Sequence, residues 1–300
     1  MKIALHEKGP VVSRIARGMM RSSEWRLTAA EMRAQIDRSL DLGVTTFDHA
    51  DIYGDYTCEA LFGEALAGMP AARARMQVVT KCGIKPVSGR HPARAVKQYD
   101  TSRAHIAASV ERSLERLHTD YIDLLLIHRP DPLMDPDEVA AAFSALRDAG
   151  KVLFFGVSNF SPSQFELLSS RVPFPLVTNQ IECSVLQTKP FEDGTLDQCM
   201  RLGVVPMAWS PLGGGSVFDG RTKQILRVRK TLLTLCRALG IDSIEKLALA
   251  WLLAHPARIV PVIGTGRMDR VEEAVEALSM ELDRAVWFEI LRASRGSDVP

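Results

Sequence analysis

Eight short apolar or β-branched segments alternate with amphipathic segments along the chain, and this alternation restricts the fold more than any other feature. The eight segments read SRIARGM at residue 13, GVTTF at 43, MQVVTK at 76, YIDLLLI at 121, KVLFFGV at 151, PLVTNQ at 175, GVVPMAW at 203 and RIVPVI at 258. Runs of this kind are typical of buried strands. The stretches between them carry apolar residues at helical spacing, as Met32, Ile36, Leu40 and Leu42 do before Gly43, which can end the helix.

Eight strand–helix units of about 30 residues predict a closed (β/α)8 TIM barrel. No Ser- or Pro-rich linker divides residues 1–300, so we expect one barrel domain over the whole chain. An open doubly wound sheet is the alternative, but it would need a G-x-G-x-x-G turn after the first strand, and the chain has none there. The opening KIALHEKGPVVSR indicates a short hairpin before the first barrel strand, which we expect at the base of the barrel.

Charge and composition favour a small-molecule partner. Lys and Arg number 37 against 36 Asp and Glu, and they are scattered, so nothing indicates binding to nucleic acid or to an anionic membrane. The N-terminus lacks a signal-peptide core, and no run approaches the roughly 18 apolar residues that span a bilayer. The five cysteines contain no C-x-x-C pair. We therefore expect a soluble cytoplasmic protein with reduced thiols and no metal, for which a monomer is plausible.

Titratable residues follow three neighbouring predicted strands. Asp48 and Tyr53 lie in VTTFDHADIYGDY at residues 44–56, Lys81 ends the next strand, and His128 follows the one after. The carboxyl ends of strands form the active face of nearly every TIM-barrel enzyme. The four side chains are therefore expected to meet there, whereas Asp51 belongs to the loop because strand side chains alternate between faces.

Such a set can reduce a carbonyl group. A tyrosine hydroxyl has a pKa near 10, and a lysine cation about 4 Å away is worth roughly 4 kcal/mol at an effective dielectric of about 20, so we expect Lys81 to lower the pKa of Tyr53. Asp48 would keep Lys81 charged, and His128 would donate a hydrogen bond to the carbonyl oxygen. Side chains cannot supply hydride, so the chemistry implies a nicotinamide cofactor.

The motifs FDHADIYG, VVTKCG, LLLIHRPDP and FFGVSNF, in this order and spacing, resemble the aldo-keto reductase superfamily, and in particular a bacterial branch of predicted oxidoreductases. The resemblance implies reduction of aldehydes or ketones to alcohols with NADPH. It implies Tyr53 as the general acid, Lys81 and Asp48 as the pair that lowers its pKa, and His128 as the residue that orients the carbonyl.

The resemblance also implies a cofactor site on the later strand ends. Ser158, Asn159 and Gln180 would bind the carboxamide and Trp209 would stack on the nicotinamide. A glycine-rich loop would approach the pyrophosphate, and the start of the last barrel helix would hold the adenosine 2′-phosphate. The expected cofactor-binding residues are Gly18, Met19, Ser158, Asn159, Gln180, Trp209, Ser210, Leu212, Gly213, Gly214, Gly264, Thr265, Gly266, Arg267, Arg270 and Glu273.

The substrate pocket and two competing functions remain open. Met20, Trp25 and Tyr56 are expected to form pocket walls. His49 stands where the family commonly has a smaller residue, and it would either tune the pH dependence or hydrogen-bond a backbone carbonyl. An NADPH-binding regulatory subunit with slow turnover is the main alternative. A metal-dependent hydrolase would use His49 and Asp51 as ligands and would leave Lys81 and Trp209 without a role.

Overall fold

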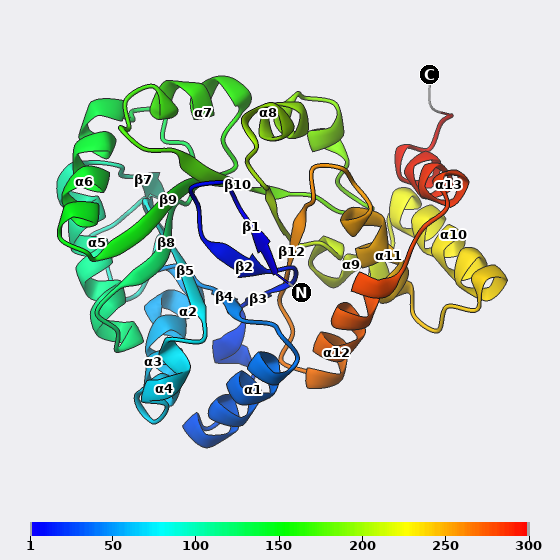
Figure 1. The fold of residues 1–300 in the computed structure, drawn as a ribbon, viewed down its shortest axis with the longest axis horizontal. Coiled ribbons are helices and arrows are strands. Elements are labelled where there is room, and N and C mark those ends of the chain that lie inside the picture. Colours follow the sequence, from blue (N-terminus) through cyan, green and yellow to red (C-terminus); the bar gives the residue numbers. More distant parts are fainter. Residues whose placement is uncertain (1, 299–300) are drawn as a thin grey trace.

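The computed structural model describes residues 2–298, in which eight parallel strands close into a barrel surrounded by helices (Figure 1). In barrel order the strands are β3 (Ala16–Gly18), β4 (Thr46–Asp48), β5 (Gln77–Cys82), β8 (Ile122–Ile127), β9 (Val152–Ser158), β10 (Leu176–Glu182), β11 (Met207–Trp209) and β12 (Val260–Ile263), and β12 pairs with β3 to close the ring. Each of the eight predicted segments overlaps one of these strands, so the predicted TIM barrel is confirmed. Met1, Val299 and Pro300 lie outside the described residues.

Helices follow every barrel strand and cover its outer surface. They are α1 (Ala29–Asp41), α3 (Cys58–Ala67), α5 (Arg103–Leu117), α6 (Pro136–Asp148), α7 (Pro162–Ser169), α8 (Thr195–Leu202), α11 (Ile244–Leu253) and α12 (Met268–Glu276), with short helices α2 (Tyr53–Tyr56), α4 (Pro70–Arg73) and α9 (Ser216–Asp219). Helix α1 begins at a capping box formed by Thr28 and Glu31. It ends before Gly43, which has a φ of 77°, as the sequence predicted.

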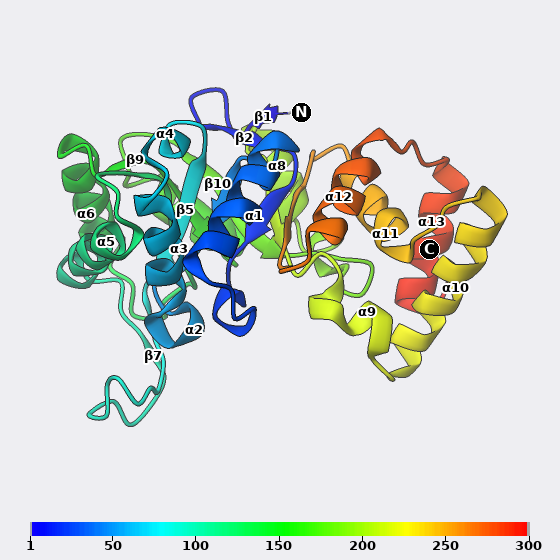
Figure 2. The same cartoon turned by 90° about the horizontal axis from the view of Figure 1, so that it is seen from below.

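A hairpin closes the amino-terminal end of the barrel. Strand β1 (Lys2–Ala4) pairs antiparallel with β2 (Val11–Ser13). Ile3, Leu5 and Val12 pack on the side chains that fill the barrel interior, and the amide of Val205 donates a 2.7 Å hydrogen bond to the carbonyl of Leu5. Figure 2 shows the hairpin on one face of the molecule and α2, α9 and the loop with β6 (Ile84–Lys85) and β7 (Gln98–Tyr99) on the other. The predicted hairpin and its place at the barrel base are confirmed.

Two long helices lie beyond the barrel and were not predicted. The connection between β11 and β12 contains α10 (Lys223–Leu239), which packs on the C-terminal helix α13 (Arg284–Arg295) at the side of the molecule (Figures 1 and 2). Trp251 and Trp287 stack with ring centres 5.0 Å apart, and each indole N–H donates to the backbone carbonyl of the other tryptophan. This stack joins α13 to α11 and the barrel. Among residues 2–298, no helix is both long enough and apolar enough to span a membrane.

The barrel core leads directly to the predicted catalytic side chains. Val79 and Leu126 belong to the cluster that fills the barrel. Lys81 lies two residues beyond Val79, and His128 lies two residues beyond Leu126. Because side-chain direction repeats every second residue along a strand, both side chains point to the barrel axis at its carboxyl end. Asp48, the last residue of β4, lies beside them.

Candidate active site

Lys81 joins the predicted catalytic groups in one buried network. Its Nζ donates to Asp48 Oδ1 at 2.6 Å, to the backbone oxygen of His49 at 2.7 Å and to the Tyr53 hydroxyl at 3.2 Å. Lys81 and Asp48 are only 1% and 2% exposed. Since an ammonium group has three donor hydrogens, all of its hydrogen-bonding capacity is used and the charge is held in one position.

The pKa of Tyr53 is raised above its usual value, which corrects the predicted lowering. Burial is the largest cause, and although the charge of Lys81 acts to lower the pKa, Asp48 acts in the opposite direction. Burial would lower the pKa of Lys81, but Asp48 and Tyr53 together raise it. At neutral pH the pair is therefore a protonated phenol beside a lysine cation. A cation in this position would stabilise a tyrosinate if the phenol gave up its proton.

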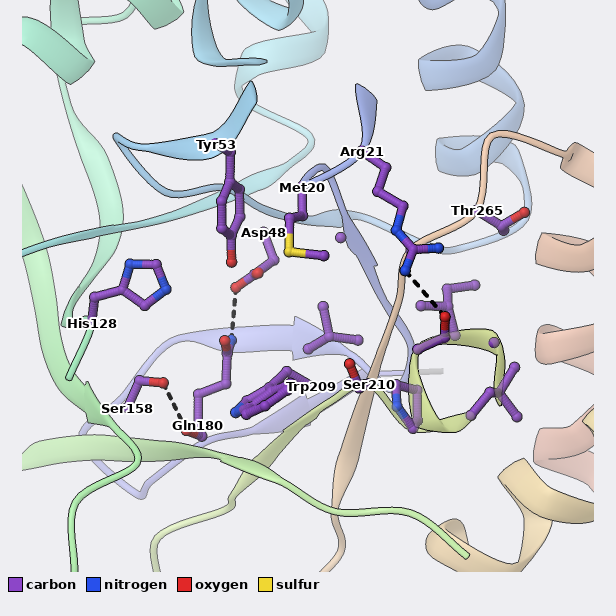
Figure 3. Close-up of a pocket in the computed structure, with 18 of the residues that line it drawn as sticks. Met20, Arg21, Asp48, Tyr53, His128, Ser158, Gln180, Trp209, Ser210 and Thr265 are labelled. Carbon is purple, nitrogen blue, oxygen red and sulfur yellow. Dashed lines mark hydrogen bonds between the residues drawn. The ribbon is translucent and has the colours of Figure 1, made fainter. Parts of the chain in front are cut away.

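A tight turn aims Tyr53 at the strand ends. The next residue, Gly54, has a φ of 59°, and the two residues after it also have positive φ. A Cβ on Gly54 would lie 2.6 Å from Cys58 Sγ and 2.7 Å from Ser23 Oγ, so neither the conformation nor the space admits another residue. Figure 3 shows the Tyr53 hydroxyl directed toward Asp48 and the cavity.

His128 is a neutral imidazole beside the tyrosine. The two ring centres are 5.8 Å apart and the rings are nearly perpendicular. Burial, assisted by the charges of Lys81 and Arg129, lowers the pKa of His128 well below its usual value. Nδ1 is buried without a hydrogen-bond partner, so a proton on Nδ1 would be orphaned and the tautomer with the proton on Nε2 is favoured. His128 can therefore donate one hydrogen bond to a ligand.

The side chains of His49 and Asp51 take no part in this arrangement, although the backbone oxygen of His49 does. His49 is fully buried with its ring against Phe62, and neither ring nitrogen has a hydrogen-bond partner. Burial and the charge of Lys81 lower the pKa of His49 to about 3, so it does not tune the pH dependence near neutrality. Its ring nitrogens have no partner, so the expected hydrogen bond to a backbone carbonyl is not formed either. Both roles expected for His49 are therefore wrong. Burial and the neighbouring Glu59 raise the pKa of Asp51 to about 8. Among the described residues, His, Cys, Asp and Glu side chains form no group of three that could hold a metal ion.

A cavity of about 640 Å³ opens at the strand ends (Figure 3). Asp48, Tyr53 and His128 line one end of it, and Thr265 and Arg270 line the other. Most of the expected cofactor residues lie along it: Gly18, Ser158, Asn159, Gln180, Trp209, Ser210, Leu212, Gly214, Gly264, Thr265 and Arg270. Of the expected substrate residues, Met20 lines the cavity.

Trp25, Tyr56 and Met19 do not line this cavity. The Trp25 ring packs against Gly266, where a Cβ would lie 2.7 Å from the ring. The Tyr56 hydroxyl accepts a 2.9 Å hydrogen bond from Arg94. Met19 is fully buried in the core.

Gly266, against which the Trp25 ring packs, and three further residues expected to contact the cofactor also lie outside the cavity lining. Arg267 forms an ion pair with Asp269. Glu273 accepts a 3.1 Å hydrogen bond from Ser243. Gly213 turns with a φ of 60°, and a Cβ on it would lie 2.6 Å from a methyl group of Leu186. Gly213 therefore shapes the glycine-rich loop from its buried side.

A chain of hydrogen bonds connects the predicted nicotinamide residues to Asp48. The indole of Trp209 donates to Asn159 Oδ1 at 2.9 Å, and the Asn159 amide donates to Ser158 Oγ at 2.7 Å. Ser158 Oγ donates to the backbone oxygen of Gln180 at 2.8 Å. The Gln180 amide donates to Asp48 Oδ2 at 2.7 Å (Figure 3). Asp48 is thus bonded to Lys81 on one oxygen and to Gln180 on the other.

The residues between the two ends of the cavity suit a nicotinamide dinucleotide. At Gly215 and Gly264, both of which line the cavity, no atom lies within 4 Å of the position of a Cβ, so a ligand can approach the backbone closely. Arg21 donates a 3.1 Å hydrogen bond to the carbonyl of Gly214 across the cavity (Figure 3). The aromatic Trp209, the glycine loop and the cationic Arg270 all line this cavity, so it offers a surface for a ring and donors for a pyrophosphate and a 2′-phosphate.

Five charged residues of the cavity were not predicted. Arg21, Glu24, Lys97, Arg129 and Glu245 line it beside the predicted residues. Arg129 directly follows His128, so its position just after a strand could have identified it as a residue of the cavity. Lys97 lies in the long loop after β5 and Glu245 in the long connection after β11, and no local pattern marks either residue.

Comparison with known proteins identifies close relatives. The family model described as "Aldo/keto reductase family" matches residues 14–294. "Uncharacterized oxidoreductase YcsN" of Bacillus subtilis is 50% identical over 96% of both chains. A "6-dehydroglucose reductase" of Agrobacterium fabrum is 46% identical over 99% of both chains. The crystal structure of the thermostable aldo-keto reductase Tm1743 with the inhibitor epalrestat has a TM-score of 0.80 and 25% identity, covering 98% of this chain and 99% of that one.

Proposed function

Because this chain belongs to the aldo/keto reductase family, and is thereby an NAD(P)H-dependent oxidoreductase, we propose that it reduces a small polar aldehyde or ketone with NADPH, with Tyr53 as the proton donor. The observation that carries the proposal is the position of Lys81. It donates to both Asp48 and Tyr53, and these two residues, with His128, line the same cavity of about 640 Å³ as the expected cofactor residues Trp209, Thr265 and Arg270.

In the proposed reaction, a bound nicotinamide supplies hydride to the carbonyl carbon. Tyr53 hydrogen-bonds to the carbonyl oxygen and transfers its proton as negative charge develops there. Lys81 stabilises the tyrosinate that results, and Asp48 holds the ammonium group in place. His128 donates a second hydrogen bond to the same oxygen, which fixes the orientation of the carbonyl group.

For the cofactor, the geometry favours a nicotinamide ring on Trp209 and a 2′-phosphate at Thr265 and Arg270. Both residues of the second pair line the far end of the cavity. Arg270 lies in the first turn of α12, where a helix N-terminus also favours an anion. These contacts support a preference for NADPH over NADH.

For the substrate, charged groups in the cavity favour a polyhydroxylated aldehyde. Lys97 and Arg129 offer hydrogen-bond donors and Glu24 an acceptor in the same cavity as Tyr53 and His128. Two relatives, 46% and 41% identical, carry the name 6-dehydroglucose reductase. A sugar aldehyde has hydroxyl groups that can bond to each of these side chains, so we propose sugar-derived aldehydes as the substrate class.

The test is oxidation of NADPH by the purified protein with a panel of carbonyl compounds. Sugar aldehydes, including 6-dehydroglucose, are compared with apolar aldehydes of similar size, and the alcohol product is identified by mass spectrometry. We expect the highest kcat/KM with the sugar aldehydes. Arg129→Met is expected to raise KM for the sugar aldehydes and to leave KM for the apolar aldehydes nearly unchanged. Tight NADPH binding without turnover of any carbonyl compound would instead favour the regulatory alternative.

A further inference from the structure

We infer that Glu245 determines how strongly the protein discriminates NADPH from NADH, because its carboxylate competes with the adenosine 2′-phosphate for the guanidinium of Arg270. The inference rests on the proposed cofactor site and adds to it a residue that lowers the preference for NADPH.

The position of Glu245 carries the inference. It is in the first turn of α11 and lines the cavity at the end where Thr265 and Arg270 lie. Its side chain is only 6% exposed, and its Oε2 lies 4.0 Å from Arg270 Nε. Within residues 2–298, no donor forms a hydrogen bond with the Glu245 carboxylate. Arg270 is therefore the basic residue with which this carboxylate forms its ion pair.

Arg270 is the cation on which this carboxylate acts. The Arg270 guanidinium lies 5.3 Å from the centre of the Phe218 ring, which also lines the cavity and limits where the guanidinium can move. Arg267 is already paired with Asp269. A 2′-phosphate bound at Arg270 would therefore meet a guanidinium whose charge Glu245 partly neutralises. The buried carboxylate of Glu245 would also repel the phosphate, because both groups are negatively charged.

The protonation of Glu245 gives this competition a pH dependence. Burial raises its pKa to about 7, with Glu273 and Asp269 also raising it and with Arg270 and Arg267 acting to lower it. A phosphate dianion bound at Arg270 raises this pKa further, because it disfavours the second negative charge. NADPH binding should therefore take up protons near neutral pH, and its affinity should fall as the pH rises. NADH lacks the phosphate, so its affinity should change little.

The experiment compares the wild-type protein with Glu245→Gln in fluorescence titrations with NADPH and NADH. The range from about pH 7 to about pH 8.5 is suitable, because the 2′-phosphate, with a second pKa near 6, is then mostly a dianion. At the upper end we expect Glu245→Gln to bind NADPH about tenfold more tightly, with NADH affinity within about twofold and a flatter pH dependence. Glu272→Gln is the control, since it removes one negative charge from α12 but from a residue that pairs with Arg38. This control should bind both dinucleotides as the wild type does.

Two results would overturn the inference while leaving the proposed function intact. One is an unchanged NADPH dissociation constant in Glu245→Gln. The other is an equal loss of affinity for NADPH and NADH, which would show that Glu245 holds a part common to both. Failure of the wild type to bind either dinucleotide would overturn the inference and the proposed function together.

A measurement on the wild-type protein tests the same inference even if the Glu245→Gln variant does not fold. Calorimetric titration with NADPH at about pH 7.5, in two buffers of different ionisation enthalpy, reports the protons exchanged on binding. We expect net proton uptake with NADPH and none with NADH. Proton release with NADPH, or the same exchange with both dinucleotides, contradicts the inference.

Discussion

Replacing Lys81 by methionine separates what the buried network contributes to catalysis from what it contributes to stability. The substitution removes the hydrogen bonds to Asp48, Tyr53 and the His49 carbonyl, and it leaves the Asp48 carboxylate, 2% exposed, with a side-chain bond only from Gln180. Removing one partner of a buried ion pair typically costs about 3–5 kcal/mol. Because the Gln180 bond remains, we expect about 3 kcal/mol. For a chain of this length that corresponds to a lowering of Tm by about 5 °C.

The double variant Asp48→Asn/Lys81→Met is the matched control. It removes the orphaned carboxylate together with the lysine, so we expect its free energy of unfolding to lie within about 1 kcal/mol of the wild type. Carbonyl reduction should nevertheless be about a hundredfold to ten-thousandfold slower in both variants, since neither has a cation to stabilise the Tyr53 anion. The single variant should also regain stability as the pH falls and Asp48 takes up a proton. Thermal unfolding followed by circular dichroism and single-turnover oxidation of NADPH measure the two effects.

Two outcomes would refute this reasoning. If Lys81→Met unfolds at the wild-type temperature at neutral pH, Asp48 is not left as an uncompensated buried charge. If the double variant recovers carbonyl reduction along with its stability, the positive charge at Lys81 is not required for proton transfer from Tyr53.

Three further predictions follow from the cavity and from the buried acid beside it. Arg270→Ala should weaken NADPH binding by more than about tenfold, through loss of a charge-assisted contact, and should leave NADH affinity nearly unchanged. Equal losses of affinity for NADPH and for NADH in fluorescence titrations would contradict this prediction. Trp209→Ala should raise the NADPH dissociation constant about two- to tenfold and reduce the quenching of protein fluorescence on binding. Unchanged affinity and quenching would show that Trp209 belongs only to the core. Asp51→Asn should stabilise the fold. Burial raises the pKa of Asp51 to about 8, whereas in the unfolded chain the carboxyl ionises near pH 4. Between these pH values the unfolded state is therefore favoured by ionisation of Asp51, and asparagine removes this loss of stability. Denaturant titration should show a gain on the order of 1–3 kcal/mol near pH 8 and little near pH 4, and a uniform gain or a loss would refute the assignment.

The barrel and its catalytic end were predictable because they depend on local regularities. Side-chain direction alternates along a strand, so Lys81 and His128 had to follow the interior residues Val79 and Leu126 at the carboxyl end. The neighbouring placement of these strands follows from the order of strand–helix units. No long-range information was required for this part of the site.

The electrostatic state of the site could not be predicted in the same way. The charges of Lys81 and Asp48 are evident in the sequence, but the pKa of Tyr53 depends on how deeply the hydroxyl is buried and on how nearly the two charges cancel. Both are properties of three-dimensional packing. The same holds for Gln180, whose bond to Asp48 joins residues 132 positions apart.

Loop side chains were the least predictable. Periodicity does not specify the direction of a side chain in a loop or in a one-turn helix such as α2, so it could not show that Tyr56 and Trp25, expected to form the substrate pocket, lie outside its lining. Glu245 was not predicted as a site residue, for a similar reason. It begins a helix in the long connection between β11 and β12, and only the closure of the barrel brings it within 4.0 Å of Arg270.

The most direct test of the central claim is a single-turnover experiment with Tyr53→Phe. The variant is loaded with NADPH, binding is verified by fluorescence quenching, and an excess of the best carbonyl substrate is added while oxidation of the bound cofactor is followed. In the proposed reaction the phenol meets the substrate oxygen, whereas the residues that line the rest of the cavity would hold the cofactor. We therefore predict NADPH affinity within a few-fold of the wild type and oxidation slower by about a hundredfold to ten-thousandfold. Oxidation at the wild-type rate in Tyr53→Phe, with loss of the reaction in Tyr56→Phe instead, would contradict the account.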